Sequence, residues 1–261
     1  MEMNPRGRAS VGLHTDVSWH DPREIAEDAP ELLAYPTGDR AAALHVAREL
    51  EALDVEAIAL EGETILDGLR VLGKGKSSIV LMCSVRGEPV AAKVRRVDAP
   101  VVDLKFEAAM LRAANLAGVG PELVGWEDDV ILMELLIGMP LATFLRNGET
   151  GVDELGRSLS LALDKARALD VARIDHGELH NPGDHVLVAR EGPEILDFGS
   201  ASASRRPANV TSLASAIVRM MGRIPDESLM QALRKYKKEM DDSSYQRVLE
   251  ELGIRWTDSF K

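Results

Sequence analysis

The sequence is poor in cysteine, in aromatic residues and in long apolar runs, and each scarcity excludes a class of protein. Its single cysteine, Cys83, rules out an internal disulfide framework and suits a reducing compartment. Aromatic residues make up only 4% of the chain, so the core must consist mainly of aliphatic side chains. The apolar runs are too short to span a membrane, and the N-terminus lacks a signal-peptide core. We therefore expect a cytoplasmic protein that makes no membrane contact.

Positive charge is also scarce. The formal net charge of -12 argues against a protein whose main function is to bind the phosphates of a nucleic acid. Arg95, Arg96, Arg205 and Arg206 could still gather into a local basic rim, although surface arginines more often only keep a protein soluble. Nucleic-acid or ribosome association is thus possible, but the net charge does not support it.

The first part of the chain changes from an irregular extension to strands. Residues 1–36 carry little periodicity, whereas Thr37–Leu53 has the apolar stripe of a helix, with Thr37 as its N-cap. Val55–Leu60 is a short strand pattern, and no recognition helix supports the weak alternative of a winged-helix DNA-binding domain. From Ile65 onward, β-rich runs are separated by the turn sequences "GKGK" and "RGE".

The later part of the chain is expected to be mainly helical. Asp103–Leu116 predicts a helix, and "DDVILMELL" predicts another strand. A helix with Thr150 as N-cap is expected next, then the short strands "DHVLV" and "EILDF", and mostly helix from Asn209. The pattern predicts an α+β protein whose strand-rich half joins a helix-rich half near Leu136. A cleft between two lobes would be a favoured ligand site.

Several polar residues stand where chemistry is plausible. The stretch "GKGKSSIV" could bring backbone N–H groups close to phosphate oxygens, although a glycine-containing hairpin is the simpler interpretation. Lys93 lies in the apolar run "VAAKV", so it is either paired or an edge-strand lysine. Glu107 stands among apolar helix residues and has Lys93 as a natural partner, unless it lies on a solvated face.

The loop "IDHGELHNPGDHVLV" concentrates acids, histidines and Asn181 before a strand. His176, His180 and His185 could form a zinc set, but no cysteine is near and their spacing is not helical. His176 is better explained as a brace of the loop through backbone bonds. Asp197 follows the next strand, where an aspartate either starts a turn or binds a hard cation such as Mg²⁺.

The motifs, and the order in which they follow one another along the chain, resemble those of the protein-kinase family. The order is a glycine-rich loop, a strand lysine, a helix glutamate, the apolar strand "ILMELL", a loop beginning His-Gly-acid, and Asp-Phe-Gly. Each motif is weak alone, but the ordered set is specific and covers roughly Ile65 to Leu213. More closely, the chain is similar to atypical archaeal serine/threonine kinases of the RIO type, because "SASASRRPANVTSL" replaces an Ala-Pro-Glu segment.

The resemblance implies a bilobal kinase-like fold. It places an extension with one helix in residues 1–60, a small antiparallel N-lobe with one helix in 61–136, and a reduced, mainly helical C-lobe in 137–261. It implies Mg-ATP bound between the lobes and these cofactor-binding residues: Gly73, Gly75, Ser78, Val80, Lys93, Glu107, Met133 as gatekeeper, and Glu134 and Leu136 for adenine. It also implies that Asp197 ligates Mg²⁺, and that Lys93 holds the α- and β-phosphates.

Two departures from the kinase pattern affect the catalytic loop. The base position holds Glu178 in place of aspartate, and a glutamate could still orient a hydroxyl proton if the backbone adjusts. No asparagine directly precedes "VLV", so the second metal ligand could be Asp184, His185 or Asn181. Asp184 is the best donor for Mg²⁺, and His185 occupies the family position by strand register.

The expected activity is ATP-dependent phosphoryl transfer to a serine or threonine hydroxyl of an unknown protein. Catalytic roles would fall to Lys93, Glu178 and Asp197. A small-molecule kinase or ATPase remains an alternative, and so does a catalytically weak pseudokinase scaffold that binds ATP. Ser200, Ser202 and Ser204 precede two arginines, so phosphorylation could order this loop.

Overall fold

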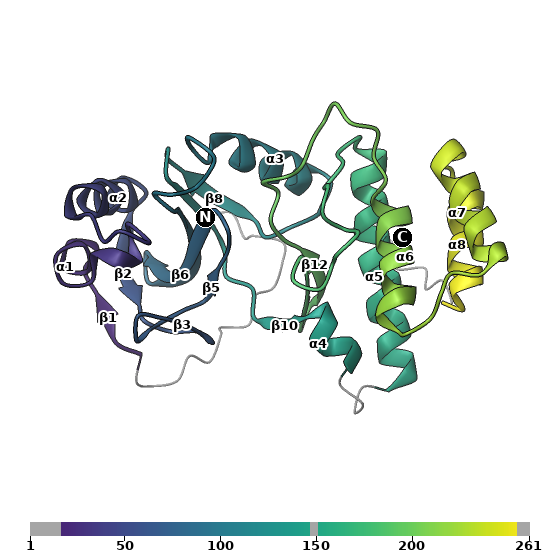
Figure 1. The fold of residues 1–261 in the computed structure, drawn as a ribbon, viewed down its shortest axis with the longest axis horizontal. Helices are drawn as coiled ribbons and strands as arrows, with labels where there is room; N and C mark the ends of the chain where they lie inside the picture. Colours follow the sequence, from purple (N-terminus) through teal and green to yellow (C-terminus); the bar gives the residue numbers. More distant parts are fainter. Residues whose placement is uncertain (1–16, 147–150, 255–261) are drawn as a thin grey trace, which may run out of the picture. The chain divides into compact units, whose positions relative to one another are not determined.

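The structure is a computed structural model that describes residues 17–146 and 151–254. The chain has a mixed α+β fold and divides into two compact units after Pro100 (Figure 1). This division differs from the expected junction near Leu136, because β8 and β9 and the helix before them belong to the second unit. None of the helices in the described ranges has the length and apolar character needed to cross a membrane.

The first unit contains an antiparallel sheet in which β1, β2, β6 and β7 follow one another, and β5 pairs with β6. A separate hairpin is formed by β3 and β4. The strands are β1 Trp19–His20, β2 Val55–Ala59, β3 Thr64–Leu66, β4 Leu69–Val71, β5 Gly73–Lys74, β6 Ser78–Val85 and β7 Glu88–Arg95. The helices are α1 Pro22–Asp28, the 3-10 helix η1 Pro30–Leu32, and α2 Arg40–Ala52.

The "RGE" turn fixes the register of the long β6–β7 hairpin. Val85 pairs with Glu88, so only Arg86 and Gly87 form the loop, and both have positive φ, 53° and 77°. Two positive φ values in a two-residue loop match the twist of the flanking strands. This register places Lys93 directly opposite Val80.

The segment before α2 is more ordered than the sequence predicts. The irregular extension contains α1 and η1, so residues 17–60 hold two α-helices where one was expected. Leu32, Leu33 and Ala34 are buried, which makes this segment part of the core. Short helices escape periodicity analysis because two turns present too few apolar positions. Helix α2 begins later than predicted, since the side chain of Asp39, and not Thr37, caps it by accepting from Ala42 N.

The second unit combines short antiparallel strands with most of the helices. β8 Leu123–Trp126 and β9 Val130–Glu134 form a hairpin, and β10 Gly138–Pro140, β11 Val186–Ala189 and β12 Gly192–Ile195 form a three-stranded sheet in that order. The helices are α3 Lys105–Leu116, α4 Leu141–Arg146, α5 Val152–Val171, α6 Asn209–Met220, α7 Glu227–Glu239 and α8 Asp242–Leu252. The structure therefore contains the helices expected after Asp103 and Thr150, whereas Thr150 itself lies outside the described residues.

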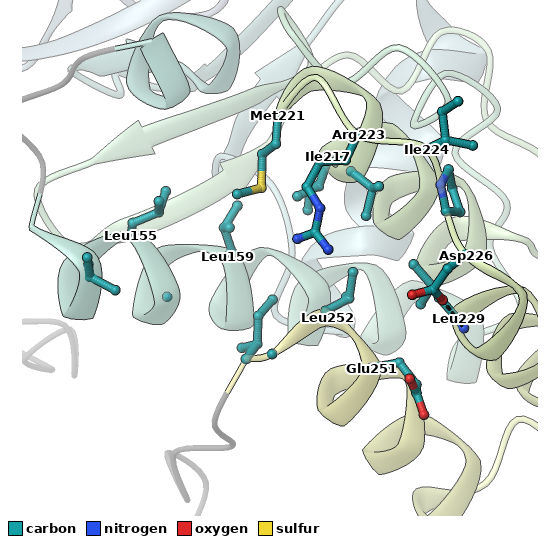
Figure 2. Close-up of a pocket in the computed structure, with 16 residues that line it drawn as sticks. Leu155, Leu159, Ile217, Met221, Arg223, Ile224, Asp226, Leu229, Glu251 and Leu252 are labelled. Carbon is teal, nitrogen blue, oxygen red and sulfur yellow. Dashed lines mark hydrogen bonds between the residues drawn. The ribbon is translucent and has the colours of Figure 1, made fainter.

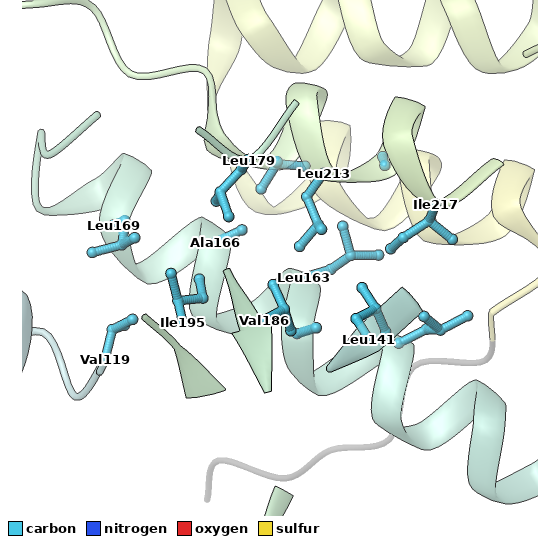
Figure 3. Close-up of a cluster of buried hydrophobic side chains, with 14 of the residues drawn as sticks. Val119, Leu141, Leu163, Ala166, Leu169, Leu179, Val186, Ile195, Leu213 and Ile217 are labelled. Atoms are coloured by element: carbon cyan, nitrogen blue, oxygen red, sulfur yellow. The ribbon is translucent and has the colours of Figure 1, made fainter. Parts of the chain in front are cut away.

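One hydrophobic cluster forms the core of the second unit. Aliphatic side chains from α5, α6, β11 and β12 meet there, as Figure 3 shows for Leu163, Leu213, Val186 and Ile195. Helices α7 and α8 pack side by side and add Tyr236 and Tyr245 to the cluster (Figure 1). Aliphatic residues dominate this core, as the low aromatic content predicts. The sheet β10–β11–β12 is thereby fixed against α5, and the loops at its ends carry the acidic residues singled out in the sequence.

Candidate functional site

In the first unit, three of the predicted nucleotide-binding residues form one row across the sheet. Gly73 of β5 pairs with Val80 of β6, and Val80 pairs with Lys93 of β7. Directly paired residues on neighbouring strands present their side chains on the same face. Lys93 is only 5% exposed, so it is not a solvated edge-strand lysine. The row places Gly73 and Lys93 on one face of the sheet, on two strands that are separated by β6.

The glycine-rich loop is a tight turn that is held by contacts with Arg96 and Tyr35. Gly75 N donates to Ser78 O at 2.8 Å, and Ser78 is buried. Arg96 donates to Gly75 O at 2.8 Å and also stacks on the ring of Tyr35, 4.9 Å from its centroid. Lys74 lies over the same ring and bonds its hydroxyl. The extension therefore contacts the loop through Tyr35, a contact that the sequence did not predict.

In the second unit, the predicted adenine-binding residues lie at the end of β9 and just beyond it. Met133 and Glu134 are the last residues of β9, and Met133 packs partly against the core. Glu134 N donates to Glu122 O at 2.8 Å, and the Glu134 carboxylate accepts from Glu122 N at 3.2 Å. Leu136 follows in an irregular segment before β10. The segment between β9 and β10 is thus irregular, and the side chains of Met133, Glu134 and Leu136 are partly exposed.

Asp197 occupies a strained turn at the end of the β-sheet. Strand β12 ends at Ile195, three residues earlier than "EILDF" predicts, because Asp197 has a φ of 67° and cannot extend a strand. Its carboxylate accepts from Gly199 N at 3.3 Å, and Phe198 between them is buried in the core. Left-handed conformations of non-glycine residues are uncommon and gather at functional sites. The exposed Asp197 carboxylate is thus fixed at a defined place.

Glu107 of α3 approaches the same turn. It lies on the buried side of α3 and is 8% exposed, which excludes the solvated-face alternative. A Cβ atom placed on Gly199 would lie 3.2 Å from Glu107 Oε2 and 3.4 Å from Asp197 Oδ1. Two carboxylates therefore converge over the Gly199 backbone. Like charges so arranged favour a bound cation or a proton.

His176 braces the loop that carries Glu178. It is fully buried, its Nε2 lies 2.9 Å from Leu196 O, and its Nδ1 accepts from Glu178 N at 3.3 Å. Its ring also makes an edge contact with Phe198, with ring centroids 5.2 Å apart. Both ring nitrogens are therefore engaged by backbone. This disfavours the zinc interpretation and agrees with the predicted bracing role.

Burial lowers the pKa of His176, and this sets a pH dependence. A histidine whose pKa is lower in the folded than in the unfolded chain contributes stability above its ordinary pKa of about 6.5, and that stability is lost as the pH falls. We expect the free energy of unfolding to drop by up to about 1.4 kcal/mol per pH unit below that value through this group. Denaturant titrations of wild type and His176→Phe from pH 8 to pH 5 should show a shallower decline for the variant.

The exposed His180 of the same loop supplies the control. Its ring lies 3.2 Å from Gly177 O, and a His180→Asn variant measured in parallel shows whether the change is specific to position 176. Parallel stability curves for wild type and His176→Phe would contradict the expectation. Such curves would mean that His176 binds protons equally in the folded and unfolded chain.

Glu178 is held close to the segment that follows the Asp197 turn. Ser200 Oγ donates to Glu178 Oε1 at 3.0 Å. Arg205 donates to Ser200 O at 2.6 Å and to Asp175 Oδ2 at 2.8 Å, so it ties this segment to the start of the loop. The carboxylate expected to act as a base therefore already holds a hydroxyl group.

The residues proposed as second metal ligands lie in the turn before β11. Asn181 and Asp184 are exposed, whereas His185 is half-buried and faces His176 with ring centroids 5.7 Å apart. His185 Nδ1 is buried without a hydrogen-bond partner in the described structure. Within the described ranges, the ligand atoms of Asp184, His185 and Asp197 do not all lie within 4.8 Å of one another. These three side chains alone do not enclose a metal ion.

A buried polar network beneath the site was not found from the sequence. Asp170, near the end of α5, accepts hydrogen bonds from Asn209 N and Nδ2, from Val210 N and from Tyr236 OH, at 2.9–3.2 Å. Asn209 in turn accepts from His176 N at 2.9 Å. Burial raises the pKa of Asp170, although these hydrogen bonds oppose the rise. The network connects α5, α6 and α7 to the loop that carries Glu178.

A pocket elsewhere in the second unit lacks comparable chemistry. It has a volume of about 180 Å³ and lies between α5, the α6–α7 connection and the end of α8 (Figure 2). Leu155, Leu159, Ile217 and Leu252 give it a largely apolar lining. Its carboxylates are engaged locally, since Asp226 caps α7 and Glu251 accepts from Ser228 Oγ at 2.7 Å.

The structure thus brings together Gly73, Val80 and Lys93 in one unit, and Glu107, Asp197 and Gly199 in the other. Glu178 joins the second group through Ser200. Comparison with known proteins adds no further assignment, because neither a protein-family model nor a curated protein sequence matches the chain.

Proposed function

We propose that this protein transfers the γ-phosphoryl group of ATP to a serine or threonine hydroxyl of a protein. Its fold would be a protein-kinase-like bilobal fold, with a β-sheet lobe and a reduced helical lobe. The observation that carries the proposal is the convergence of the Glu107 and Asp197 carboxylates over Gly199, in a turn held by a left-handed aspartate. Two carboxylates so arranged favour the binding of a cation.

The residues present fit Mg²⁺ in part. Asp197 is an exposed oxygen donor, and Asp184 offers another, whereas the His185 nitrogen suits Mg²⁺ less well. Since Mg²⁺ is usually bound by one or two carboxylates together with substrate phosphates, a complete cage of protein ligands is not required. When bound, the ion would neutralise negative charge on the phosphates.

The protein's own residues would bind the phosphates and the adenine and would orient the acceptor hydroxyl. The Lys93 ammonium would bind phosphate oxygens beside the backbone of Gly73 and Gly75, and Val80 would contact the nucleotide base. Met133, Glu134 and Leu136 would receive adenine at the end of β9. Glu178 would accept the hydrogen bond of the acceptor hydroxyl and orient it for attack, which is the task of a general base.

Replacing Lys93 with methionine tests the proposal in the first unit. A charge-assisted hydrogen bond contributes about 1.5–3 kcal/mol, so kcat/KM for ATP should fall about 10- to 100-fold. Methionine keeps most of the buried side-chain volume, but removing one partner of a buried charged interaction destabilises a protein, so the folding of the variant is checked separately. The measurement is phosphate transfer from radiolabelled ATP with Mg²⁺, with unfolding curves recorded in parallel.

Lys105→Met is the matched control, because Lys105 is exposed and pairs with Asp128 at the surface. It should keep wild-type kinetics. Products should be separated into phosphoprotein, phosphorylated metabolites and inorganic phosphate. Labelled metabolites without phosphoprotein would favour a small-molecule kinase, and ATP-dependent thermal stabilisation without any transfer would favour a pseudokinase scaffold.

A further inference from the structure

The hydroxyl of Ser200 occupies the position that an acceptor hydroxyl would take. It donates to Glu178 Oε1 at 3.0 Å, within the range of about 2.6–3.2 Å required between a general base and the proton it receives. Ser200 is exposed and follows Asp197 by three residues. An incoming serine on another protein would have to displace this hydroxyl to reach Glu178.

The backbone around Ser200 is held in place, so the contact does not depend on a loose loop. Arg205 bonds Ser200 O at 2.6 Å and Asp175 at 2.8 Å. Gly177 has a φ of 89°, and a Cβ atom there would lie 2.7 Å from Ser200 O. The close approach of the two segments therefore requires glycine at position 177.

The neighbouring serines are placed differently. Ser202 is buried and exchanges two backbone hydrogen bonds with Asp175, at 2.9 and 2.8 Å. Its Oγ accepts from Ser204 N and Arg205 N, and the Ser204 hydroxyl lies 3.1 Å from it. The hydroxyls of Ser202 and Ser204 thus stabilise the local turn, whereas the Ser200 hydroxyl donates a hydrogen bond to Glu178, the candidate base. Geometry distinguishes Ser200 among the three.

We propose that Ser200 is the protein's own phosphoryl acceptor and is modified within the same chain. The inference rests on the proposed function. Glu178 takes the proton of the Ser200 hydroxyl while Oγ forms a bond to the γ-phosphorus of ATP. The bond from that phosphorus to the β,γ-bridging oxygen breaks, and ADP leaves with the electron pair. The products are phosphoserine at position 200, ADP and one proton.

Modification of Ser200 would also limit further transfer. A phosphate at this position carries about -1.5 to -2 charges and would stand beside the Glu178 carboxylate. The repulsion would prevent Glu178 from holding another hydroxyl, and the Arg205 guanidinium nearby would retain the phosphate. Phosphorylated protein should therefore modify other substrates more slowly than unmodified protein.

The test is phosphosite mapping by mass spectrometry after incubation of the full chain with ATP and Mg²⁺. We expect about one phosphate per chain, on Ser200, with a first-order rate that does not change when the protein is diluted tenfold. Ser200→Ala should lose the phosphate, whereas the matched variant Ser204→Ala should retain it. Glu178→Gln should slow the modification about 100-fold or more, the usual contribution of a general base.

The outcomes separate this inference from the proposed function. Transfer to an added protein such as casein or myelin basic protein, with Ser200 unmodified, would overturn the inference and leave the function standing. Phosphate only on Ser202 or Ser204, or a rate that scales with protein concentration, would overturn it equally. Absence of transfer to every acceptor would overturn the function as well.

Discussion

An Asp197→Asn variant should lose phosphoryl transfer almost completely while folding normally. Asparagine tolerates the left-handed conformation that Asp197 adopts, so the turn and the burial of Phe198 should persist. The substitution removes the negative charge that would attract the cation over Gly199. Removing one preorganised group that stabilises charge commonly costs about 100- to 1000-fold in rate, and we expect a loss of that size. Initial rates of phosphate transfer, measured under saturating ATP, provide the readout.

Asp67→Asn is the matched control for this prediction. Asp67 also has a positive φ, 49°, in the turn between β3 and β4, so the same substitution acts on a similar backbone. It should leave the rate unchanged. Normal turnover by a well-folded Asp197→Asn protein would remove the proposed mechanism, whereas equal losses in both variants would point to a general effect on folding.

An Asp170→Ala variant should show the largest loss of stability. The carboxylate is only 2% exposed and accepts hydrogen bonds from two backbone N–H groups at the start of α6, from Asn209 and from Tyr236. Each buried donor left without an acceptor costs about 1–3 kcal/mol, so a loss of about 3 kcal/mol or more is expected. Negative charge at this helix N-terminus is lost as well. Urea unfolding gives the difference directly.

Asp164→Ala on the same helix is the comparison. Asp164 is more accessible and accepts from Tyr245 OH at 2.7 Å, so its loss should cost about 1 kcal/mol. Tyr236→Phe removes only one bond from the Asp170 carboxylate and should have an effect of similar size. If Asp170→Ala were no more destabilising than Asp164→Ala, the network would not carry the stability assigned to it.

The sequence predicts the elements of this protein better than its tertiary contacts. The strands around Lys93, the helix containing Glu107 and the long helix after residue 151 follow from apolar periodicity and turn residues. Asp197 was expected either to start a turn or to bind a cation; the structure places it in a turn, and its φ of 67° shortens the expected strand. Periodicity does not report left-handed backbone, because the conformation is decided by what packs around the turn.

The sequence contained weaker signals for contacts between residues that are far apart in the chain. Asp170 continues the apolar stripe of Leu159, Leu163 and Ala166, so a buried carboxylate could have been suspected from spacing alone. The pairing of Ser200 with Glu178 had no such signal, since both lie in loops without periodicity. The contact between Tyr35 and the glycine-rich loop depends on how the short N-terminal extension folds against the sheet. The local sequence does not specify this.

The burial of Cys83 has a practical consequence. This side chain is wholly covered on β6, and burial raises the pKa of its thiol to about 12. Maleimides react with the thiolate, so the native sulfur should resist labelling while the protein is folded. Because the chain has one cysteine, new ones at Lys76 and Ser204 would carry a fluorophore pair without removing it. Energy transfer between those dyes could then follow how the distance between the two units responds to added nucleotide.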